Sequence, residues 1–336
     1  MSCHVLICDD SAMARKQLSK ALPKDWDVTI DFAGNGAEAL EKIQTGGVDV
    51  MFLDLNMPVK DGYETLEEIQ RCDLPVIVIV VSGDIQPEAV QRTRALGAYD
   101  FIKKPVSLER LLEIQEQFGL FSLRGEWTEP VVYDVQATTP KGFDALREIS
   151  NVAMGRAADL LAQLLNVFVQ LPIPKVNQLE VSELQMALDL AARQETFSAV
   201  CQGLIGEGMR GEGLLIMYDS SYQDLAQLLG YQDKLNPTLE SEMVMDIASI
   251  LIGAFSKGLA EQLDVAFSSS HPVILGRHLD FSDLVRNNAH RWQRTLAIEI
   301  TYIIEKQNIR CDLLLLFTED SLPVLQKKVG YLVESV

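Results

Sequence analysis

Polar residues that could transfer a phosphoryl group follow the short apolar runs in the first third of the chain. Asp9 and Asp10 come after HVLIC, Asp54 follows VMFL, Ser82 follows VIVIVV, and Lys104 follows a fifth run. Carboxylates held close together repel one another unless a hard cation lies among them, and Mg²⁺ prefers oxygen ligands. An ionised aspartate can attack phosphorus and form an acyl phosphate, while lysine and hydroxyl groups bind phosphate oxygens. The set predicts a phosphoryl-transfer site.

The apolar runs have the composition of buried strands, and helical patterns separate them. We expect strands at 4–8, 28–33, 50–53, 76–81 and 98–103, and helices at 11–22, 37–44 and 108–117, the first of them capped by Ser11. Alternating strands and helices predict a doubly wound parallel sheet of five strands. Because ligands bind at the carboxyl ends of such strands, the polar residues should share one rim.

A second group of polar residues lies on one predicted helix, at 144–165. Asp144, Glu148, Asn151 and Gly155 recur at helical spacing and define a polar stripe, with apolar residues mostly on the opposite face. An amide both donates and accepts hydrogen bonds, so the stripe combines a carboxylate with a group that can do both. We expect this stripe to be accessible to a partner.

The stripe recurs later in the chain at the same spacing, as Glu242, Asp246, Ser249 and Gly253. The segments 196–231 and 295–331 also repeat one pattern of strand, turn, strand and helix. The duplication predicts one α/β domain with an internal pseudo-twofold repeat. Asp246 is one methylene shorter than glutamate, and Ser249 lacks the reach of an amide. We therefore expect the second site to be degenerate, with little or no activity.

The first motif set resembles the response regulator receiver family, which includes CheY and has a flavodoxin-like fold. The resemblance rests on Asp9-Asp10, Asp54, Asn56-Met57-Pro58, Asp61-Gly62, Ser82-Gly83 and Lys104-Pro105. It implies phosphorylation of Asp54 by a CheA-like histidine kinase. It further implies that Asp10, Asp54 and the carbonyl of Asn56 bind Mg²⁺ and that Asp9 acts through water. Ser82 and Lys104 would bind the phosphoryl group, and the Lys104–Pro105 peptide would be cis.

One position departs from that family. Where many members have a tyrosine three residues before the lysine, this chain has Phe101. A phenylalanine can turn inward but cannot form the hydroxyl's hydrogen bond, so the departure bears on how strongly phosphorylation switches the domain.

The stripe and the proline that follows it resemble the signature of the CheC, CheX and FliY phosphatases. The pattern that carries the resemblance is Asp144-x3-Glu148-x2-Asn151-x22-Pro174. These proteins hydrolyse the acyl phosphate of a phosphorylated CheY-like receiver. The resemblance implies that Asn151 orients the attacking water. It also implies that Glu148 forms an ion pair with the conserved lysine of the target receiver.

Composition and charge narrow the possible partners and cellular compartments. A formal net charge of −19 disfavours nucleic acid as a partner. The five cysteines are scattered and form no C-x-x-C pair, which is typical of a reducing compartment. Acidic residues near the start exclude a signal peptide there, and we find no apolar run approaching the length of a membrane span. We expect a cytoplasmic protein without membrane contact.

These inferences predict a receiver domain at 1–120, a linker at 121–140 and a CheC-like phosphatase domain at 141–336. The substrate would be a phosphorylated CheY-like receiver, either a separate protein or the chain's own. The alternative is a phosphorylation-gated adaptor or phosphate sink with an inactive binding domain. A transcription factor is disfavoured, because we find no helix-turn-helix with basic recognition residues. The sequence does not decide whether the chain forms a homodimer.

Overall fold

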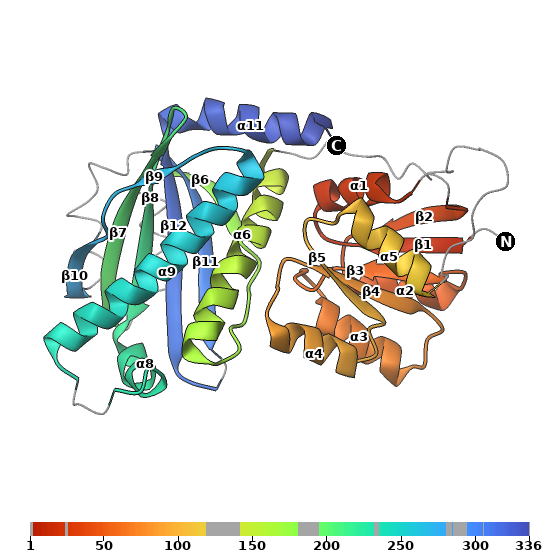
Figure 1. Ribbon diagram of the computed structural model, residues 1–336, viewed down its shortest axis with the longest axis horizontal. Coiled ribbons are helices and arrows are strands. Elements are labelled where there is room, and N and C mark those ends of the chain that lie inside the picture. Colours follow the sequence, from red (N-terminus) through yellow and green to blue (C-terminus); the bar gives the residue numbers. More distant parts are fainter. Residues whose placement is uncertain are drawn as a thin grey trace. The chain divides into compact units, whose positions relative to one another are not determined.

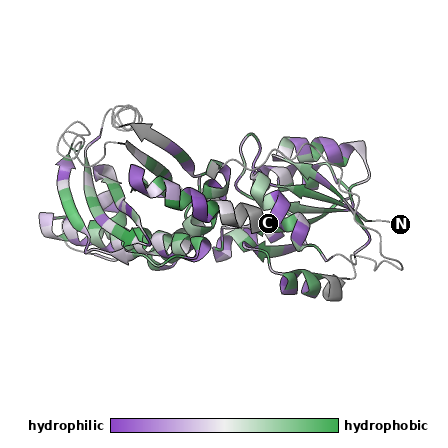
Figure 2. Ribbon diagram, turned by 90° about the horizontal axis from the view of Figure 1, so that it is seen from above, coloured by the Kyte–Doolittle hydropathy of each residue, from purple (hydrophilic) through white to green (hydrophobic). Residues whose placement is uncertain are grey.

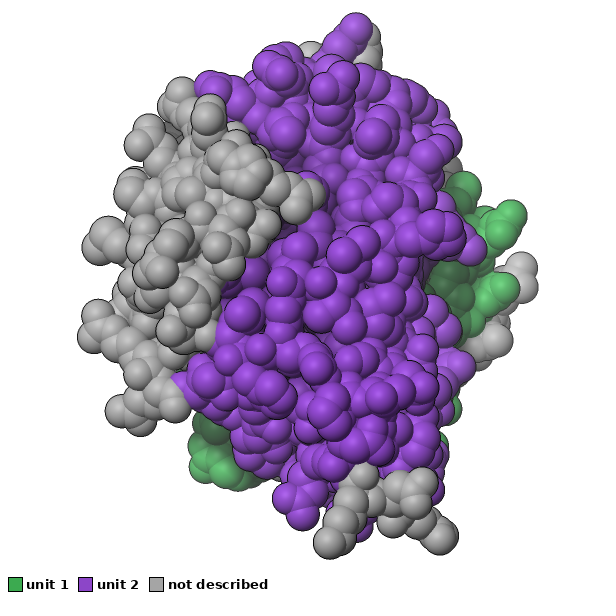
Figure 3. Space-filling view, turned by 90° about the vertical axis from the view of Figure 1, so that its left-hand side faces the viewer, with its two compact units in different colours: residues 1–148, 333–336 green, residues 149–332 purple. Residues whose placement is uncertain are grey.

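The computed structural model describes residues 3–23, 26–118, 142–180, 195–231, 235–279, 284, 294–304 and 306–335. The chain forms two compact units, one of residues 1–148 with 333–336 and one of residues 149–332 (Figure 3). The linker predicted at 121–140 lies outside the described residues, and the predicted domain boundaries remain predictions. Residues 142–148, the start of a long helix, belong to the first unit.

The first unit contains a parallel five-stranded sheet in the order β2-β1-β3-β4-β5 (Figure 1). Its strands are β1 (Cys3–Cys8), β2 (Val28–Ala33), β3 (Val50–Leu53), β4 (Ile77–Ser82) and β5 (Asp100–Lys103). The doubly wound sheet predicted from the sequence is thereby confirmed. Parallel order places the carboxyl ends of all five strands at one edge, where the polar residues were expected.

Helices cover both faces of this sheet and create two apolar cores. They are α1 (Ala12–Ala21), α2 (Gly36–Thr45), α3 (Gly62–Arg71), α4 (Pro87–Ala95) and α5 (Leu108–Phe118). One core joins α1 and α5 to the sheet around the fully buried Trp26, and the other includes Leu40 of α2 and Leu66 of α3. Ser11 caps α1 as predicted, accepting a hydrogen bond from the Ala14 amide.

The second unit is built on an antiparallel sheet in the order β10-β7-β8-β12-β11-β6, with the short strand β9 (Ser268–Ser269) paired to β7. The other strands are β6 (Lys175–Glu180), β7 (Phe197–Gly206), β8 (Met209–Tyr218), β10 (Val273–Leu279), β11 (Arg294–Ile304) and β12 (Ile309–Thr318). The strands are largely hydrophobic (Figure 2). The four leucines Leu313–Leu316 are buried in β12.

The duplication is visible in the strand order. The predicted pairs are β7 with β8 and β11 with β12, each followed by a 3-10 turn and a helix, α8 (Tyr222–Leu228) or α11 (Leu322–Ser335). Beyond the prediction, each half has a third strand that pairs with the other half. Strand β6 pairs with β11, and β10 pairs with β7. Each half is therefore completed by a strand from the other.

Two long helices, α6 (Gly142–Leu165) and α9 (Pro237–Leu263), lie side by side on one face of this sheet (Figure 1). They approach closely at Gly258, where an added Cβ atom would lie 2.9 Å from the Ala153 Cα. Within the described residues, α9 is long and apolar enough to pass for a membrane span, with a mean hydropathy of 1.5 in its most apolar stretch. The sequence reading missed this stretch. Much of α9 is buried against the sheet, which accounts for its apolar composition.

Candidate functional site

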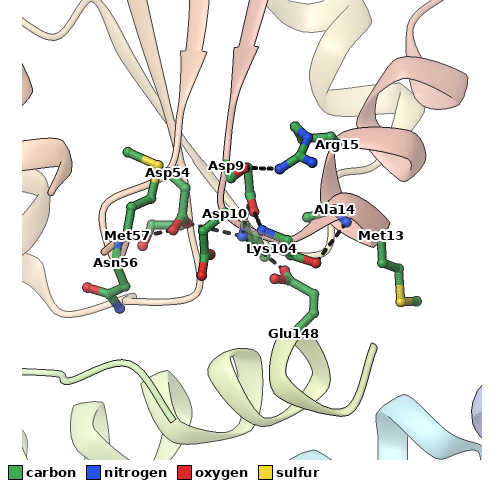
Figure 4. Close-up of polar contacts among 12 residues, drawn as sticks. Asp9, Asp10, Met13, Ala14, Arg15, Asp54, Asn56, Met57, Lys104 and Glu148 are labelled. Atoms are coloured by element: carbon green, nitrogen blue, oxygen red, sulfur yellow. Dashed lines mark hydrogen bonds and ion pairs between the residues drawn. The ribbon is translucent and has the colours of Figure 1, made fainter. Parts of the chain in front are cut away.

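Three aspartates meet at the carboxyl edge of the parallel sheet. Asp9 and Asp10 follow β1, and Asp54 follows β3, so the parallel pairing of these strands brings their ends together. One carboxylate oxygen from each lies within 4.8 Å of the other two. Asp9 and Asp54 are buried, and Asp10 is partly buried. Figure 4 shows the three side chains converging.

Lys104 provides the positive charge of this cluster. It follows β5, and its Nζ lies 2.8 Å from Asp9 Oδ2, 3.1 Å from Asp54 Oδ1 and 2.9 Å from Glu148 Oε1. Its side chain is only 5% exposed. The Lys104–Pro105 peptide is cis, as the resemblance implied. One buried ammonium group thus contacts three carboxylates, which leaves the cluster with excess negative charge.

This excess charge is reflected in the acidities of the carboxyl groups. Burial raises the pKa of Asp10 to about 7, and repulsion from Asp9 adds to this effect. Burial also raises the pKa of Asp54 and of Glu148, although Lys104 opposes both shifts. For Lys104, attraction from Asp54 and the other carboxylates outweighs burial, and its pKa is raised. A divalent cation among the aspartates would relieve the repulsion.

The donor set fits Mg²⁺. Asp10 Oδ2 and Asp54 Oδ1 are buried oxygens without a hydrogen bond among the described residues. Each is close to a basic side chain but is left with lone pairs for a metal. The Asn56 amide donates a 3.0 Å hydrogen bond to Asp54 Oδ2, which fixes the carboxylate and the loop that carries the Asn56 carbonyl. These are the groups to which the resemblance assigned the metal.

Neighbouring backbone holds the aspartates in place. The Ser11 amide donates a 2.8 Å hydrogen bond to Asp9 Oδ1, and the Arg15 guanidinium donates to the Asp9 carbonyl. At Gly62 an added Cβ atom would lie 2.4 Å from the carbonyl oxygen of Asp54. The glycine of the Asp61-Gly62 motif is therefore required for the loop after β3 to pass this close to α3.

Ser82 and Phe101 lie where the sequence placed them. Ser82 ends β4 at the same edge of the sheet, and its Oγ accepts a 3.1 Å hydrogen bond from the Asp84 amide. Phe101 lies on β5, is 7% exposed and belongs to the core shared with α2 and α3. The ring therefore occupies an inward position in this structure.

The start of α6 adds three side chains to the aspartate cluster, all within the first unit. Asp144 Oδ2 accepts a 3.3 Å hydrogen bond from the Met13 amide in the first turn of α1. Arg147 Nη2 lies 3.3 Å from Asp10 Oδ2 and 3.0 Å from Asp144 Oδ1. Glu148 pairs with Lys104, as described above. Sequence reasoning identified Asp144 and Glu148 but missed Arg147, which lies beside the stripe.

The expected accessibility of the stripe is wrong. Glu148 is 7% exposed and Asn151 is 4% exposed. Glu148 is buried because it joins the Lys104 cluster, a contact that a helical pattern cannot reveal. Asn151 lies one turn further along α6, and its Oδ1 is a buried acceptor without a hydrogen bond among the described residues. The amide thus retains an unused acceptor.

The second copy of the stripe has a different environment. Asp246 and Ser249 are exposed on α9, beside a shallow hollow of about 500 Å³ that includes Glu242 in its lining. The Ser249 hydroxyl donates a 2.7 Å hydrogen bond to the Met245 carbonyl of its own helix. This serine therefore directs its proton to the backbone. The degenerate character of the second site remains a prediction.

Known proteins resemble the first third of the chain. The model of the response regulator receiver domain matches residues 5–116. CheY of Bacillus subtilis is 35% identical over 113 residues, which cover 34% of this chain and 94% of CheY. A protein-glutamate methylesterase/protein-glutamine glutaminase of Syntrophomonas wolfei is 41% identical over 118 residues. The match covers 34% of this chain and 33% of the methylesterase, so the chain spans only about one third of that relative.

One solved structure is also similar to part of this chain. A chain of the CheX-CheY-BeF3-Mg²⁺ complex from Borrelia burgdorferi is 32% identical, with a TM-score of 0.33. The match covers 34% of this chain and 89% of that one. The near-complete coverage of Bacillus CheY, together with the matching domain model, identifies the N-terminal part. Through these residues the chain belongs to the response regulator receiver family.

Proposed function

We propose that this chain is a response regulator whose Asp54 accepts a phosphoryl group from a CheA-like histidine kinase, and whose helix α6 carries the residues that remove it. The substrate of the phosphatase step is the chain's own receiver. The observation that carries this proposal is the 2.9 Å ion pair between Glu148 Oε1 and Lys104 Nζ.

That ion pair is informative because of the role assigned to each partner. Resemblance to the CheC, CheX and FliY phosphatases implies that Glu148 binds the conserved lysine of a target receiver. Lys104 is that lysine in this chain. The pairing supports action in cis and gives a physical reason for the burial of Glu148.

Phosphorylation uses the groups at the edge of the parallel sheet. An oxygen of Asp54 bonds to phosphorus as the bond from phosphorus to the donor's imidazole nitrogen breaks, and the electron pair remains on the imidazole. Receiver domains bind Mg²⁺ at an acidic pocket, and this cation offsets the charge of the incoming phosphoryl group. Lys104 and Ser82 bind phosphoryl oxygens, so Lys104 exchanges carboxylate partners for the phosphoryl group.

Hydrolysis requires a positioned water molecule. The water oxygen bonds to phosphorus, the bond from phosphorus to Asp54 breaks, and the carboxylate leaves with the electron pair while the water proton passes to the solvent. Asn151 is one helical turn from Glu148, and its unused amide oxygen can accept a hydrogen bond from this water. Orientation of the water supplies the rate enhancement, and no strong base is required.

The decisive variant is Asn151→Ala. The full chain is phosphorylated with a radiolabelled small acyl phosphate in Mg²⁺ buffer, freed of donor, and followed for loss of label. We expect Asn151→Ala to lengthen the half-life of phospho-Asp54 by about tenfold or more. Ser249→Ala, at the corresponding position of the second copy, is the matched control and should decay as wild type does. Equal half-lives for wild type and Asn151→Ala would remove the phosphatase assignment.

The alternative is a phosphorylation-gated adaptor or phosphate sink. The altered second stripe, with Asp246 and Ser249 in place of glutamate and asparagine, favours this alternative. An adaptor predicts that neither asparagine nor serine replacement changes the lifetime of phospho-Asp54, and that phosphorylation changes binding to a chemotaxis protein. The resemblance to methylesterases extends over about one third of either chain, which is the size of one receiver domain. It therefore gives no support for esterase chemistry in residues 149–332.

A further inference from the structure

Two basic side chains, Lys104 and Arg147, form ion pairs with the three aspartates and with Glu148. Lys104 contacts Asp9, Asp54 and Glu148, and no ion pair between Lys104 and Asp10 is formed among the described residues. Asp10 is instead met by Arg147, whose Nη2 lies 3.3 Å from its Oδ2. Arg147 is thus the counter-ion of one of the aspartates to which Mg²⁺ binding is assigned.

The guanidinium of Arg147 is held in its position by a second contact. It donates a 3.0 Å hydrogen bond to Asp144, three residues earlier on α6. Asp144 in turn accepts a hydrogen bond from the Met13 amide in the first turn of α1, where backbone N–H groups have no helical partner. The chain from Met13 through Asp144 to Arg147 therefore orients a positive charge toward Asp10.

The contact between Arg147 and Asp10 is of a kind that a metal ion can replace. Asp10 Oδ2 is buried and accepts no hydrogen bond among the described residues, so the guanidinium contributes mainly charge. The Arg147 side chain is 34% exposed and has room to turn outward. Mg²⁺ would bind such an oxygen at about 2.0–2.1 Å. A divalent ion at that distance would repel a guanidinium that stayed in contact with the same oxygen.

We propose that Arg147 is an internal counter-ion that competes with Mg²⁺ for Asp10, so that metal binding and the contact of α6 with the receiver oppose each other. The competition rests on the assignment of Mg²⁺ to Asp10 and is independent of hydrolysis by Asn151. By linkage, the coupling is reciprocal: Arg147 weakens Mg²⁺ binding, and Mg²⁺ weakens the Arg147 contact by the same factor. Because phosphorylation requires the metal, the start of α6 restrains loading of its own receiver.

The test is calorimetric titration of the full, unphosphorylated chain with MgCl₂. We expect Arg147→Gln to lower the Kd for Mg²⁺ by about two- to fivefold, the range for a partly exposed ion pair. Arg147→Lys keeps the charge and should stay closer to wild type. Arg156→Gln is the control, because Arg156 lies on the same helix but pairs with Glu261. An unchanged or higher Kd for Arg147→Gln, in a chain with the wild-type circular dichroism spectrum, would overturn the proposal.

Hydrogen exchange provides the reciprocal measurement. In wild type, saturating Mg²⁺ should increase amide exchange at 142–148, and in Arg147→Gln this increase should be smaller. Absence of any Mg²⁺ effect on these amides in wild type would also contradict the competition. The affinity for Mg²⁺ and the lifetime of phospho-Asp54 are separate quantities, measured here on different variants. Loss of the phosphatase assignment would therefore leave this result intact, and failure of the competition would leave the phosphatase test intact.

Discussion

Glu148 Oε1 lies 2.9 Å from Lys104 Nζ, so the lysine assigned to bind the phosphoryl group is already paired with a carboxylate from helix α6. Both side chains are nearly inaccessible, with 8% and 5% exposed. The ion pair therefore has two consequences. In this structure Glu148 shares Lys104 with Asp9 and Asp54, and in the proposed function it holds the start of α6 beside the lysine that binds the phosphoryl group.

Replacement of Glu148 tests the second consequence. Glu148→Gln removes the charge but nearly preserves the shape, and we expect the half-life of phospho-Asp54 to lengthen by about tenfold, since one partner of a buried charge pair is lost. Label retention over time measures this half-life. Asp246→Asn, at the matching position of the second copy, is the control. If both variants lengthened the half-life by the same factor, the half-life of phospho-Asp54 would not depend on the Glu148–Lys104 pair.

Replacement of Lys104 tests its electrostatic role in the folded receiver. Lys104→Met leaves Asp9, Asp54 and Glu148 buried without their shared cation. We expect it to lower the free energy of unfolding of the first unit by about 3 kcal/mol in metal-free buffer at neutral pH. Urea denaturation measures this change. Added Mg²⁺ should restore part of the loss, and a wild-type midpoint without metal would show that the lysine is not needed to balance these charges.

Two glycines offer a matched pair of steric predictions. Gly62→Ala would place a Cβ atom 2.4 Å from the Asp54 carbonyl oxygen, whereas an added Cβ at Gly253 meets nothing within 4 Å. We expect Gly62→Ala to destabilise the first unit by about 1–3 kcal/mol. Gly253→Ala, in the exposed interior of α9, should stabilise the second unit by about 0.5–1 kcal/mol. Hydrogen exchange measured in urea gives the stability of each unit separately. A change in stability of the same sign in both variants would contradict these predictions.

His278 should make the stability of the second unit depend on pH. Its Nδ1 lies 2.8 Å from Asp219 Oδ2, and this hydrogen bond raises the pKa of His278. A raised pKa in the folded state means that the stabilisation is complete below the unfolded pKa and is lost as pH rises through the folded value. His278→Asn should therefore cost about 0.5 kcal/mol more at about pH 5.5 than at about pH 8.5. An equal cost at both pH values would rule out a contribution from the charged imidazole.

The receiver site could be predicted from the sequence because its residues lie at strand ends. Once a run such as VMFL is read as a parallel strand, the rule for carboxyl ends places Asp54 beside Asp9 without further information. The same reasoning located Lys104. The duplicated pairs β7–β8 and β11–β12 were predicted because each pair is local in the sequence.

What could not be predicted depends on contacts between distant segments. Strands β6 and β10 pair with the opposite half of the duplicated sheet, and a local pattern does not name a partner strand. The burial of Glu148 and the role of Arg147 depend on contacts with Lys104 and Asp10, far away in the sequence. An arginine beside a polar stripe has no distinctive spacing, because long basic side chains are common on solvated helices.

The central claim, removal of the phosphoryl group by the same chain that carries it, is tested most directly by the decay of phospho-Asp54 as the protein is diluted. Over about two powers of ten in concentration, an intramolecular step keeps one half-life, since its effective concentration is set within the chain. We predict a constant wild-type half-life, shorter than that of Asn151→Ala at every dilution. Phosphorylated Asn151→Ala should not decay faster when mixed with excess unphosphorylated Asp54→Asn. A wild-type half-life that lengthens on dilution to that of Asn151→Ala would contradict the account.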